Sequence, residues 1–292
     1  MKEVLLCQRL DDKKVRCQTC AHYCVVLPNK RGICGVRENI DGKLYALNYG
    51  KLIACQIDPI EKKPLYHFLP GTYSLSIAAV GCNFACQNCQ NWQISQASKP
   101  AKPISGKGAT PQEIVDLALK NKLPSISYTY TEPAIFSEYA LDTMKIARRN
   151  GLKNVWVTNG FWSKELLNEV YPYLDAANVD LKSFDDDFYQ KICRGRLQPV
   201  LDTLKGLKKK KIWVEITTLV LPGLNDQEKG FKEIAMFIKK ELGVETPWHV
   251  SRFFGDVSWR LKDLPDTPTE IIKTAYQIGK KAGLENVYMG NV

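Results

Sequence analysis

The sequence predicts an α/β protein in which parallel strands alternate with helices. The chain has 292 residues, of which 45% are hydrophobic and 25% are charged, as in a soluble globular protein with a substantial core. After residue 70, short apolar runs rich in β-branched side chains alternate with amphipathic stretches. Repeated strand-then-helix units imply parallel strands joined by right-handed crossovers.

Six stretches have the composition of strands, and they are Ser74–Gly81, Ser125–Tyr130, Asn154–Gly160, Ala176–Lys182, Ile212–Val220 and Trp248–Phe254. Between them, Thr110–Asn121 has a clear helix start, because a threonine cap is followed by Pro111 and then by Glu113. Such an array forms an open doubly wound sheet or a full or partial barrel. We predict a partial (β/α)6 barrel of the TIM type over residues 71–292.

Residues 1–70 are predicted to form a small cysteine-rich module laid against the barrel. Residues 15–39 are loop-like, with Pro28, Gly32 and Gly35. Lys43–Asp58 alternates like a β-hairpin with a turn near Tyr49-Gly50. Farther along, Ser98–Gly108 is predicted to be a flexible loop.

Charge and cysteine content point to a cytoplasmic metalloprotein. The N-terminal sequence has no signal-peptide core, and no apolar run approaches the ~18–20 residues of a membrane span. The net charge of +10 comes largely from lysines, as in Lys205–Trp213. We interpret these lysines as solvated helix faces in preference to a nucleic-acid-binding surface. In a reducing compartment, clustered cysteines favour metal over disulfides, and only Cys7, Cys55 and Cys193 lie outside the two clusters.

The second cluster, Cys82-x3-Cys86-x2-Cys89, follows the first barrel strand. A four-iron cluster normally takes one protein thiolate per iron, so three thiolates on one loop leave one iron open to another ligand. Gly81 allows close approach of the backbone. The alternative is a zinc site whose fourth ligand is distant, such as Cys193 or His67.

Polar groups also gather at the carboxyl ends of the later strands, where sites form in such folds. They are Thr131-Glu132-Pro133, Thr158-Asn159-Gly160, Asp180-Leu181-Lys182, Glu215 within its strand, and His249, Ser251 and Arg252. Each has a structural alternative. Glu132 can offset a helix dipole, Asn159 can be a turn residue, Asp180 and Lys182 can pair only with each other, and His249 can be a core histidine.

These motifs together resemble the radical SAM superfamily, in particular the pyruvate formate-lyase activating enzyme-like proteins and, among them, the AmmeMemoRadiSam-system enzymes. The resemblance covers nearly the whole chain, through Asp58–Gly71, Gly81–Ser95, Tyr128–Tyr139, Val157–Gly160, Asn178–Phe184, Trp213–Asp226, Pro247–Phe253 and Val287–Val292. It implies that Cys82, Cys86 and Cys89 ligate a [4Fe–4S] cluster. It further implies that S-adenosylmethionine (SAM) is cleaved reductively to a 5′-deoxyadenosyl radical, which abstracts a hydrogen atom from a substrate.

The same resemblance implies roles for the strand-end residues. Glu132 would accept hydrogen bonds from the SAM amino group, and Asn159, Asp180 and Lys182 would line the SAM pocket. Glu215, His249 and Arg252 are assigned to the cofactor side, with His249 and Arg252 facing the ribose, the adenine or the substrate. Asn88 departs from the family, which usually has an aromatic residue before the third cysteine; adenine contacts are then expected from Phe84 or Trp92.

The first cluster, Cys17-x2-Cys20-x3-Cys24-x9-Cys34, supplies four thiolates, enough for a closed tetrahedral zinc site. A second iron–sulfur cluster is the alternative, and His22 is a less favoured replacement ligand.

The leading functional hypothesis is a radical SAM enzyme that uses an external one-electron reductant and acts on a small molecule or a protein. The alternative is an activase of a glycyl-radical enzyme. A zinc-stabilised nucleic-acid-binding protein is a remote third, because no groove-reading helix or aromatic RNA-binding motif is present.

Overall fold

A computed structural model describes residues 1–99 and 102–292. Within these residues the main sheet has nine strands in the order β15-β14-β13-β12-β11-β10-β8-β7-β9. Its parallel strands are β8 (Tyr73–Ala79), β10 (Ser125–Tyr128), β11 (Lys153–Thr158), β12 (Ala176–Asp180), β13 (Trp213–Val220), β14 (Trp248–Arg252) and β15 (Val287–Gly290). The predicted alternation of parallel strands and helices is confirmed.

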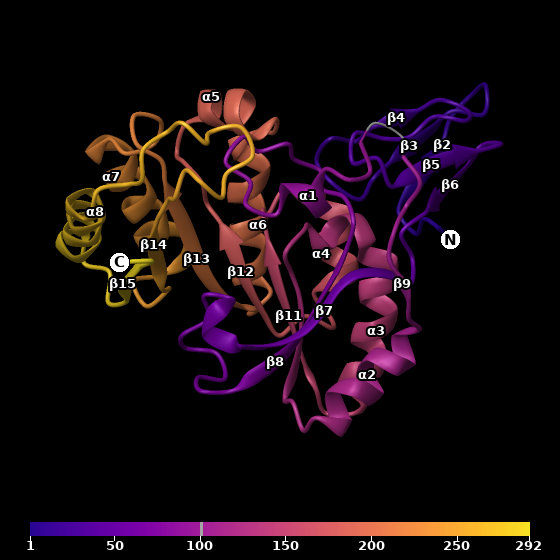
Figure 1. Cartoon of the computed structure of the whole chain (residues 1–292), viewed down its shortest axis with the longest axis horizontal. Helices are drawn as coiled ribbons and strands as arrows, with labels where there is room; N and C mark the ends of the chain where they lie inside the picture. Colours follow the sequence, from indigo (N-terminus) through magenta and orange to yellow (C-terminus); the bar gives the residue numbers. More distant parts are fainter. Residues whose placement is uncertain (100–101) are drawn as a thin grey trace.

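Helices connect successive parallel strands (Figure 1). The longer ones are α2 (Pro111–Lys120), α3 (Ser137–Arg149), α4 (Lys164–Val170), α6 (Leu197–Lys209), α7 (Glu228–Phe237) and α8 (Thr269–Ala282). The shorter ones are α1 (Trp92–Ser95), α5 (Asp186–Phe188), the 3₁₀ helices Ile60–Lys62 and Pro133–Phe136, and the π-helical turns Tyr189–Cys193 and Ile238–Leu242. Helix α2 begins as predicted, because Thr110 and Glu113 form a reciprocal capping box. Among the described residues, no helix combines the length and apolarity needed to cross a membrane.

Strand β15 is a seventh parallel strand, beyond the six that the sequence predicts. It pairs with β14 from Val287 to Gly290, beyond the last predicted strand. The bond from Trp248 N to Asn286 O, 3.0 Å, extends this pairing. A strand of four residues is too short to give a periodic hydrophobic pattern in the sequence. Strand β15 is therefore recognised only through its hydrogen-bonded pairing with β14.

The N-terminal residues form two small sheets at the opposite end of the molecule from β15 (Figure 1). One contains β1 (Lys2–Glu3), β6 (Lys43–Ala46) and β5 (Arg37–Ile40), and the other contains β2 (Cys7–Arg9), β3 (Val15–Cys17) and β4 (Val25–Val26). Their core consists of Val4, Val15, Cys17, Val26, Leu44 and Ala46.

The hairpin predicted over Lys43–Asp58 is wrong. Strand β6 pairs with β5 and β1, whereas β7 (Lys51–Pro59) pairs antiparallel with β8 and with β9 (Lys107–Gly108) in the main sheet. The actual hairpin is β5–β6, where Asp41 and Gly42 both have positive φ, at 51° and 82°. An Asp-Gly pair with this conformation favours a two-residue hairpin, so the decisive turn signal lies earlier in the chain.

This pairing bears on the domain division, because β7 lies within the predicted N-terminal part yet belongs to the main sheet. We therefore propose that the small module ends near residue 50. Of the predicted loop Ser98–Gly108, Pro100 and Ala101 lie outside the described residues, and Lys107–Gly108 is strand β9.

The module packs directly on the loop that follows β8. Gly81 has φ +106°, and a Cβ there would lie 2.7 Å from Val36 Cγ1 and 3.3 Å from the carbonyl oxygen of Cys34. Ser98 Oγ donates to the same Cys34 carbonyl at 2.9 Å. A side chain at position 81 would therefore separate the module from the cysteine loop.

Candidate active site and metal centres

The three-cysteine loop joins the end of β8 to α1 and is held by the segment before α6. Ala85 N donates to the carbonyl of Cys193 at 3.0 Å, and Gln87 N donates to the carbonyl of Ile192 at 3.0 Å. Phe84 is buried against Gly195, where a Cβ would lie 2.2 Å from the Phe84 ring. The protein backbone therefore sets the path of this loop.

Cys193 lies beside Cys86, since the two bonds from Ala85 and Gln87 flank Cys86 and place the buried thiol of Cys193 next to it. A hydrogen bond with Cys193, together with burial, raises the pKa of Cys86 well above its ordinary value. His67, the other candidate for a fourth zinc ligand, lies elsewhere, with Nε2 2.7 Å from the Tyr288 hydroxyl. In the described chain, no three His, Cys, Asp or Glu side chains have the geometry of a metal site.

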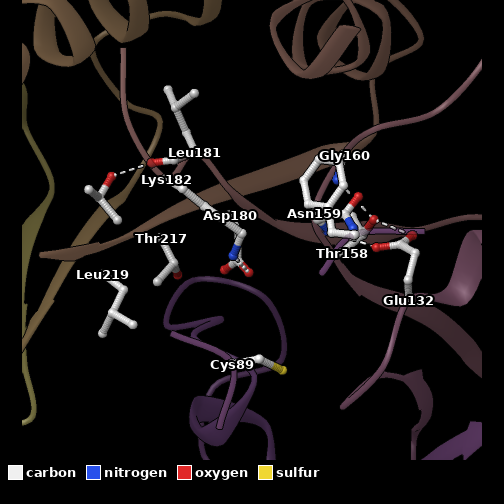
Figure 2. Close-up of polar contacts among 12 residues, drawn as sticks. Cys89, Glu132, Thr158, Asn159, Gly160, Asp180, Leu181, Lys182, Thr217 and Leu219 are labelled. Atoms are coloured by element: carbon white, nitrogen blue, oxygen red, sulfur yellow. Dashed lines mark hydrogen bonds and ion pairs between the residues drawn. The ribbon is translucent and has the colours of Figure 1, made fainter. Parts of the chain in front are cut away.

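Glu132 is a buried carboxylate at the end of β10 that accepts hydrogen bonds from the end of β11. Its oxygens accept from Thr158 Oγ1 at 2.7 Å and from Asn159 N at 2.8 Å (Figure 2). They also accept from Ala134 N at 3.0 Å. The bond from Ala134 N caps the 3₁₀ helix Pro133–Phe136, so Glu132 lies at a helix N-terminus, as the helix-dipole alternative requires. Burial, the largest effect, raises the pKa of Glu132 to about 7 despite these donors.

Asn159 connects this strand end to the cysteine loop. Its side-chain Nδ2 donates to Asn83 Oδ1 at 2.7 Å and lies 3.8 Å from Cys82 Sγ. Its Oδ1 accepts from Phe161 N at 3.0 Å. Glu132, Asn159 and Cys82 therefore form one contiguous group at the ends of β8, β10 and β11.

Asp180 and Lys182 form a second group at the next strand end. Lys182 Nζ donates to Asp180 Oδ2 at 2.7 Å (Figure 2). Burial lowers the pKa of Lys182, but Asp180 and the cysteines Cys86 and Cys193 outweigh this effect and hold it well above its ordinary value. An ammonium group thus lies close to the cysteine loop, where it can attract an anionic group.

Glu215 and His249 belong to a different cluster. Glu215 accepts from Tyr66 N at 3.0 Å, His67 N at 2.9 Å and Trp213 Nε1 at 3.1 Å, and His249 Nε2 lies 2.7 Å from it. Among the described residues, the hydrogen bonds of the Glu215 side chain run to His249, Trp213 and the segment Pro64–His67, and not to Glu132 or Lys182. In the strand register, however, His249 and Asp180 both stand opposite Thr217. Glu215 and His249 hold the segment Pro64–His67 against strands β12 to β14, where Asn178 Nδ2 also donates to the carbonyl of Pro64 at 2.8 Å.

The anchoring role of the Pro64–His67 segment was missed from the sequence. His249 stacks on Tyr288 with ring centroids 5.2 Å apart, and Tyr66 packs edge-on against it at 4.6 Å. This arrangement favours the core-histidine alternative for His249. The only available signal was the apolar and aromatic composition of PLYHF, which carries no partner information.

Arg252, at the end of β14, contacts residues that follow it in the sequence. Its Nε donates to the carbonyl of Thr267 at 2.6 Å, and its guanidinium lies over the Phe254 ring at 5.1 Å. Asn291 Nδ2 donates to the Arg252 carbonyl at 3.2 Å. The predicted contact with a ribose, an adenine or a substrate remains a prediction.

The four N-terminal cysteines surround a small cavity of about 20 Å³, lined by Cys17, Cys20, Cys24 and Cys34 together with His22 and Arg37. Burial raises the pKa of the Cys20 and Cys34 thiols, so a bound cation is the natural means of stabilising their thiolates. Within residues 1–99 and 102–292, Arg37 Nε is a buried donor without an acceptor. A thiolate sulfur in this cavity would satisfy it.

Arg37 was not identified from the sequence, although it is central here. Its guanidinium nitrogens donate to both carboxylate oxygens of Glu138, at 3.0 and 2.9 Å, at the start of α3. His22, between two of the cysteines, places Nε2 2.9 Å from the carbonyl oxygen of Asn83. That contact occupies one ring nitrogen of His22 and connects the first cysteine cluster to the residue after Cys82.

Comparison with known families shows the superfamily of this chain. Residues 76–235 match the Radical SAM superfamily. The chain belongs to the radical SAM superfamily. It is 48% identical, over its full 292 residues and 86% of the relative, to an uncharacterized protein of Methanocaldococcus jannaschii.

More distant radical SAM relatives define the type. The chain is 24% identical over 40% of its length to pyruvate formate-lyase 1-activating enzyme of Escherichia coli (strain K12), and it spans half of that enzyme. A domain of pyruvate-formate lyase-activating enzyme from Bacteroides vulgatus has a TM-score of 0.50 at 20% identity, covering 56% of this chain and 98% of the domain. A radical SAM methyltransferase from Sphaerobacter thermophilus has a TM-score of 0.58 at 15% identity, covering 76% of this chain and 67% of the methyltransferase.

These similarities confirm the partial barrel and the pyruvate formate-lyase activating enzyme-like type of this radical SAM protein. Its assignment to the AmmeMemoRadiSam system stays a prediction. The soft thiolate donors of Cys82, Cys86 and Cys89 suit an iron–sulfur cluster, and the adjacent ammonium of Lys182 and amide of Asn159 suit a polar cofactor. The residues present therefore fit the cofactors of the family.

Asn88 occupies the position before the third cysteine of the radical SAM loop and is buried, with 6% of its surface exposed. In the described parts of the chain, its Oδ1 has no hydrogen-bond partner. Phe84 is fully enclosed by Phe161, Tyr189 and Gly195, so it does not present a face to a ligand. Of the two aromatic residues expected near an adenine, Trp92 is therefore the more exposed.

Proposed function

We propose that this protein is a radical SAM enzyme that holds a [4Fe–4S] cluster through Cys82, Cys86 and Cys89. The observation that carries the proposal is the position of the Lys182 ammonium beside a loop with this cysteine spacing, one strand away from the Glu132–Asn159 group. When bound, the cluster and SAM would supply a 5′-deoxyadenosyl radical that removes a hydrogen atom from the substrate.

The chain's own residues position and shield this chemistry. Lys182, kept protonated by Asp180, offers a cation for the SAM carboxylate. Glu132 fixes the end of β11, and through it the Asn159 amide, against the cysteine loop. We propose that Glu132 acts mainly by this orientation, because its oxygens already accept three bonds from the protein.

For the substrate we propose a small molecule or a protein side chain, with electrons from an external one-electron donor. The similarity to a pyruvate formate-lyase activating enzyme supports a second candidate, activation of a glycyl-radical enzyme by removal of a hydrogen atom from a glycine. The ten free cysteines fit the reducing cytoplasm as the proposed location.

At the N-terminal site we propose a structural zinc held by Cys17, Cys20, Cys24 and Cys34. The four cysteines that line one small cavity, and the buried donor Arg37 Nε beside them, support a thiolate-bound cation at this place. A second iron–sulfur cluster, with the same four thiolates, is the alternative. His22 is not included, because its Nε2 contacts the Asn83 carbonyl.

The test uses protein purified and reconstituted without oxygen. With dithionite and SAM it should form 5′-deoxyadenosine, and Lys182→Met should weaken SAM binding more than it changes the iron content. Metal analysis should find iron near four and zinc near one per chain, order-of-magnitude values for a four-iron cluster and one zinc site. An iron content near eight per chain would mean that the N-terminal cysteines hold a second iron–sulfur cluster and not zinc. A colourless protein without deoxyadenosine formation would exclude the enzyme.

A further inference from the structure

A fifth cysteine lies next to the N-terminal set. Cys7 is isolated in the sequence, but strands β2 and β3 pair so that Cys7 stands directly opposite Cys17. Cys17 is one of the four cysteines that line the cavity, whereas Cys7 is not among the lining residues. Cys7 is thus a neighbour of a proposed ligand and itself lies outside the lining of the cavity.

The type of cross-strand pair decides how close these two residues are. Gln18 N donates to the carbonyl of Leu6 and Leu10 N to the carbonyl of Lys14, each at 2.9 Å. In an antiparallel ladder, hydrogen-bonded and non-hydrogen-bonded pairs alternate, so the Cys7/Cys17 pair between them is non-hydrogen-bonded. Such pairs have Cα atoms about 4.5 Å apart and side chains on the same face.

This separation suits a disulfide, for which the Cα atoms lie roughly 4.4–6.8 Å apart. At present each thiol points to another acceptor. Cys7 Sγ lies 3.7 Å from the carbonyl oxygen of Val4, and Cys17 Sγ lies 3.5 Å from Thr19 Oγ1. A rotation about χ1 of each residue, with no change of backbone pairing, brings the sulfurs together. Cys7 is partly exposed, so an oxidant reaches it from solvent.

We propose that Cys7 and Cys17 form a reversible disulfide that withdraws Cys17 from the metal. The disulfide and the metal compete for one sulfur, since a ligand sulfur in a disulfide is no longer a thiolate. The proposal rests on the N-terminal metal site proposed above. It makes this site a thiol switch that releases its ion upon oxidation.

The oxidant is a hydroperoxide, and the reaction balances with two electrons. The Cys7 thiolate attacks one peroxide oxygen, giving a sulfenic acid and one water after protonation. The Cys17 thiolate then attacks the sulfenic sulfur and expels hydroxide, which becomes the second water. Both sulfurs are oxidised by one electron each, hydrogen peroxide is reduced to two waters, and a dithiol reverses the step.

The experiment compares the full-length wild type with Cys7→Ser and Cys55→Ser. Cys55 is also exposed, but it lies on β7, outside both cysteine clusters, so its variant is the matched control. Each metal-loaded protein is treated with hydrogen peroxide, released metal is measured, and linked peptides are mapped without reduction. Cys34→Ser, which removes a proposed ligand, reports how much of the bound metal belongs to the N-terminal site.

Wild type and Cys55→Ser should release the N-terminal ion together with formation of a Cys7–Cys17 linked peptide, and dithiothreitol with added metal should restore binding. Cys7→Ser should release that ion severalfold more slowly. Equal release from Cys7→Ser, or a linked pair that excludes Cys7, would overturn the switch. If Cys34→Ser binds as much metal as wild type, the metal site itself is wrong, whereas a linked Cys7–Cys17 peptide would still establish the disulfide.

Discussion

Cys86 is the loop cysteine whose surroundings matter most for testing the cluster assignment, because a second thiol lies beside it. Replacing Cys86 by alanine removes one of three thiolates, and we expect loss of most of the iron and of the brown colour. Cys193→Ala is the matched control. It also removes the contact between Cys86 and Cys193, but the loop keeps its three cysteines, so the iron should be retained. Iron content and visible absorbance are the measurements.

The reverse pattern, with iron lost in Cys193→Ala and retained in Cys86→Ala, would mean that Cys193 is a ligand in place of Cys86. From the sequence alone, Cys193 is a candidate only for a distant fourth zinc ligand. Its position beside Cys86 is a result of the turn Tyr189–Cys193, which follows α5.

Glu132 should make the stability of the protein depend on pH. Its pKa is raised by burial from an ordinary 4.5 to about 7, so the folded protein binds this proton more tightly than the unfolded chain does. The stabilisation is complete at low pH and is lost as the pH rises from about 4.5 to about 7, by roughly 3 kcal/mol. In Glu132→Gln this loss should be absent.

Urea unfolding of the metal-free protein at pH 5 and pH 8 measures the effect. The comparison concerns the change between the two pH values, because the glutamine amide also alters the bonds to Thr158 and Asn159. Glu113→Gln, at an exposed helix cap, is the control and should retain the wild-type dependence. An unchanged pH dependence in Glu132→Gln would contradict the raised pKa.

At the scale of elements, the segment Pro64–His67 depends on Glu215. Burial raises the pKa of Glu215, but the His249 ring and the N–H groups of Tyr66, His67 and Trp213 hold it below its ordinary value. The carboxylate is fully buried, so its removal leaves these donors without an acceptor. We expect Glu215→Ala to lower the free energy of unfolding by about 3 kcal/mol or more.

Glu245→Ala is the control for this prediction. Glu245 pairs with Lys208 through side chains that are 51% and 38% exposed, so the loss should stay below about 1 kcal/mol. The two variants are compared by denaturant unfolding. If Glu215→Ala were as mild as Glu245→Ala, the segment would not depend on this carboxylate, and a site role for Glu215 would regain support.

The elements also show where local signals decided the outcome. Helix α2 was predicted with its cap because Thr110 and Glu113 carry the whole signal within one turn. The prediction of a hairpin over Lys43–Asp58 is wrong because an alternating pattern indicates strands but carries no information about which strands pair. The Asp41-Gly42 turn would have indicated the correct β5–β6 pair.

At the scale of the whole molecule, Arg37 fastens the N-terminal module to the barrel. The ion pair with Glu138 is 2–3% exposed at both side chains, and Arg37 Nη2 also lies 3.3 Å from the Ala134 carbonyl and 3.2 Å from Ser137 Oγ. Arg37→Met leaves a buried carboxylate without its partner, so we expect a loss of about 3–5 kcal/mol in the free energy of unfolding.

The double variant Arg37→Met/Glu138→Met removes both charges and should recover a large part of this loss, because replacing a buried pair by apolar side chains of similar size is often nearly neutral. Denaturant unfolding of both variants gives the comparison. No recovery would mean that Arg37 acts mainly through the cysteine cavity and not through Glu138. Both variants lack the Nε donor, so a role of Arg37 at the cysteine cavity should lower the metal content of both variants equally. A role through Glu138 should instead appear as a difference in the free energy of unfolding between the two variants.

The strand–helix alternation, the family and the two cysteine groups can be read from the amino-acid sequence, because the spacing of residues within a short stretch of chain carries each of them. Which of the candidate residues meet depends on the folding of the whole chain. Cys7 stands opposite Cys17, Cys193 lies beside Cys86, and Arg37 reaches Glu138 across 101 positions. Glu215 and His249, selected at strand positions like those of Asp180, instead hold an internal segment. The physical reason is that a strand end fixes where a side chain starts, whereas its partner comes from a distant segment whose position depends on packing of the whole chain.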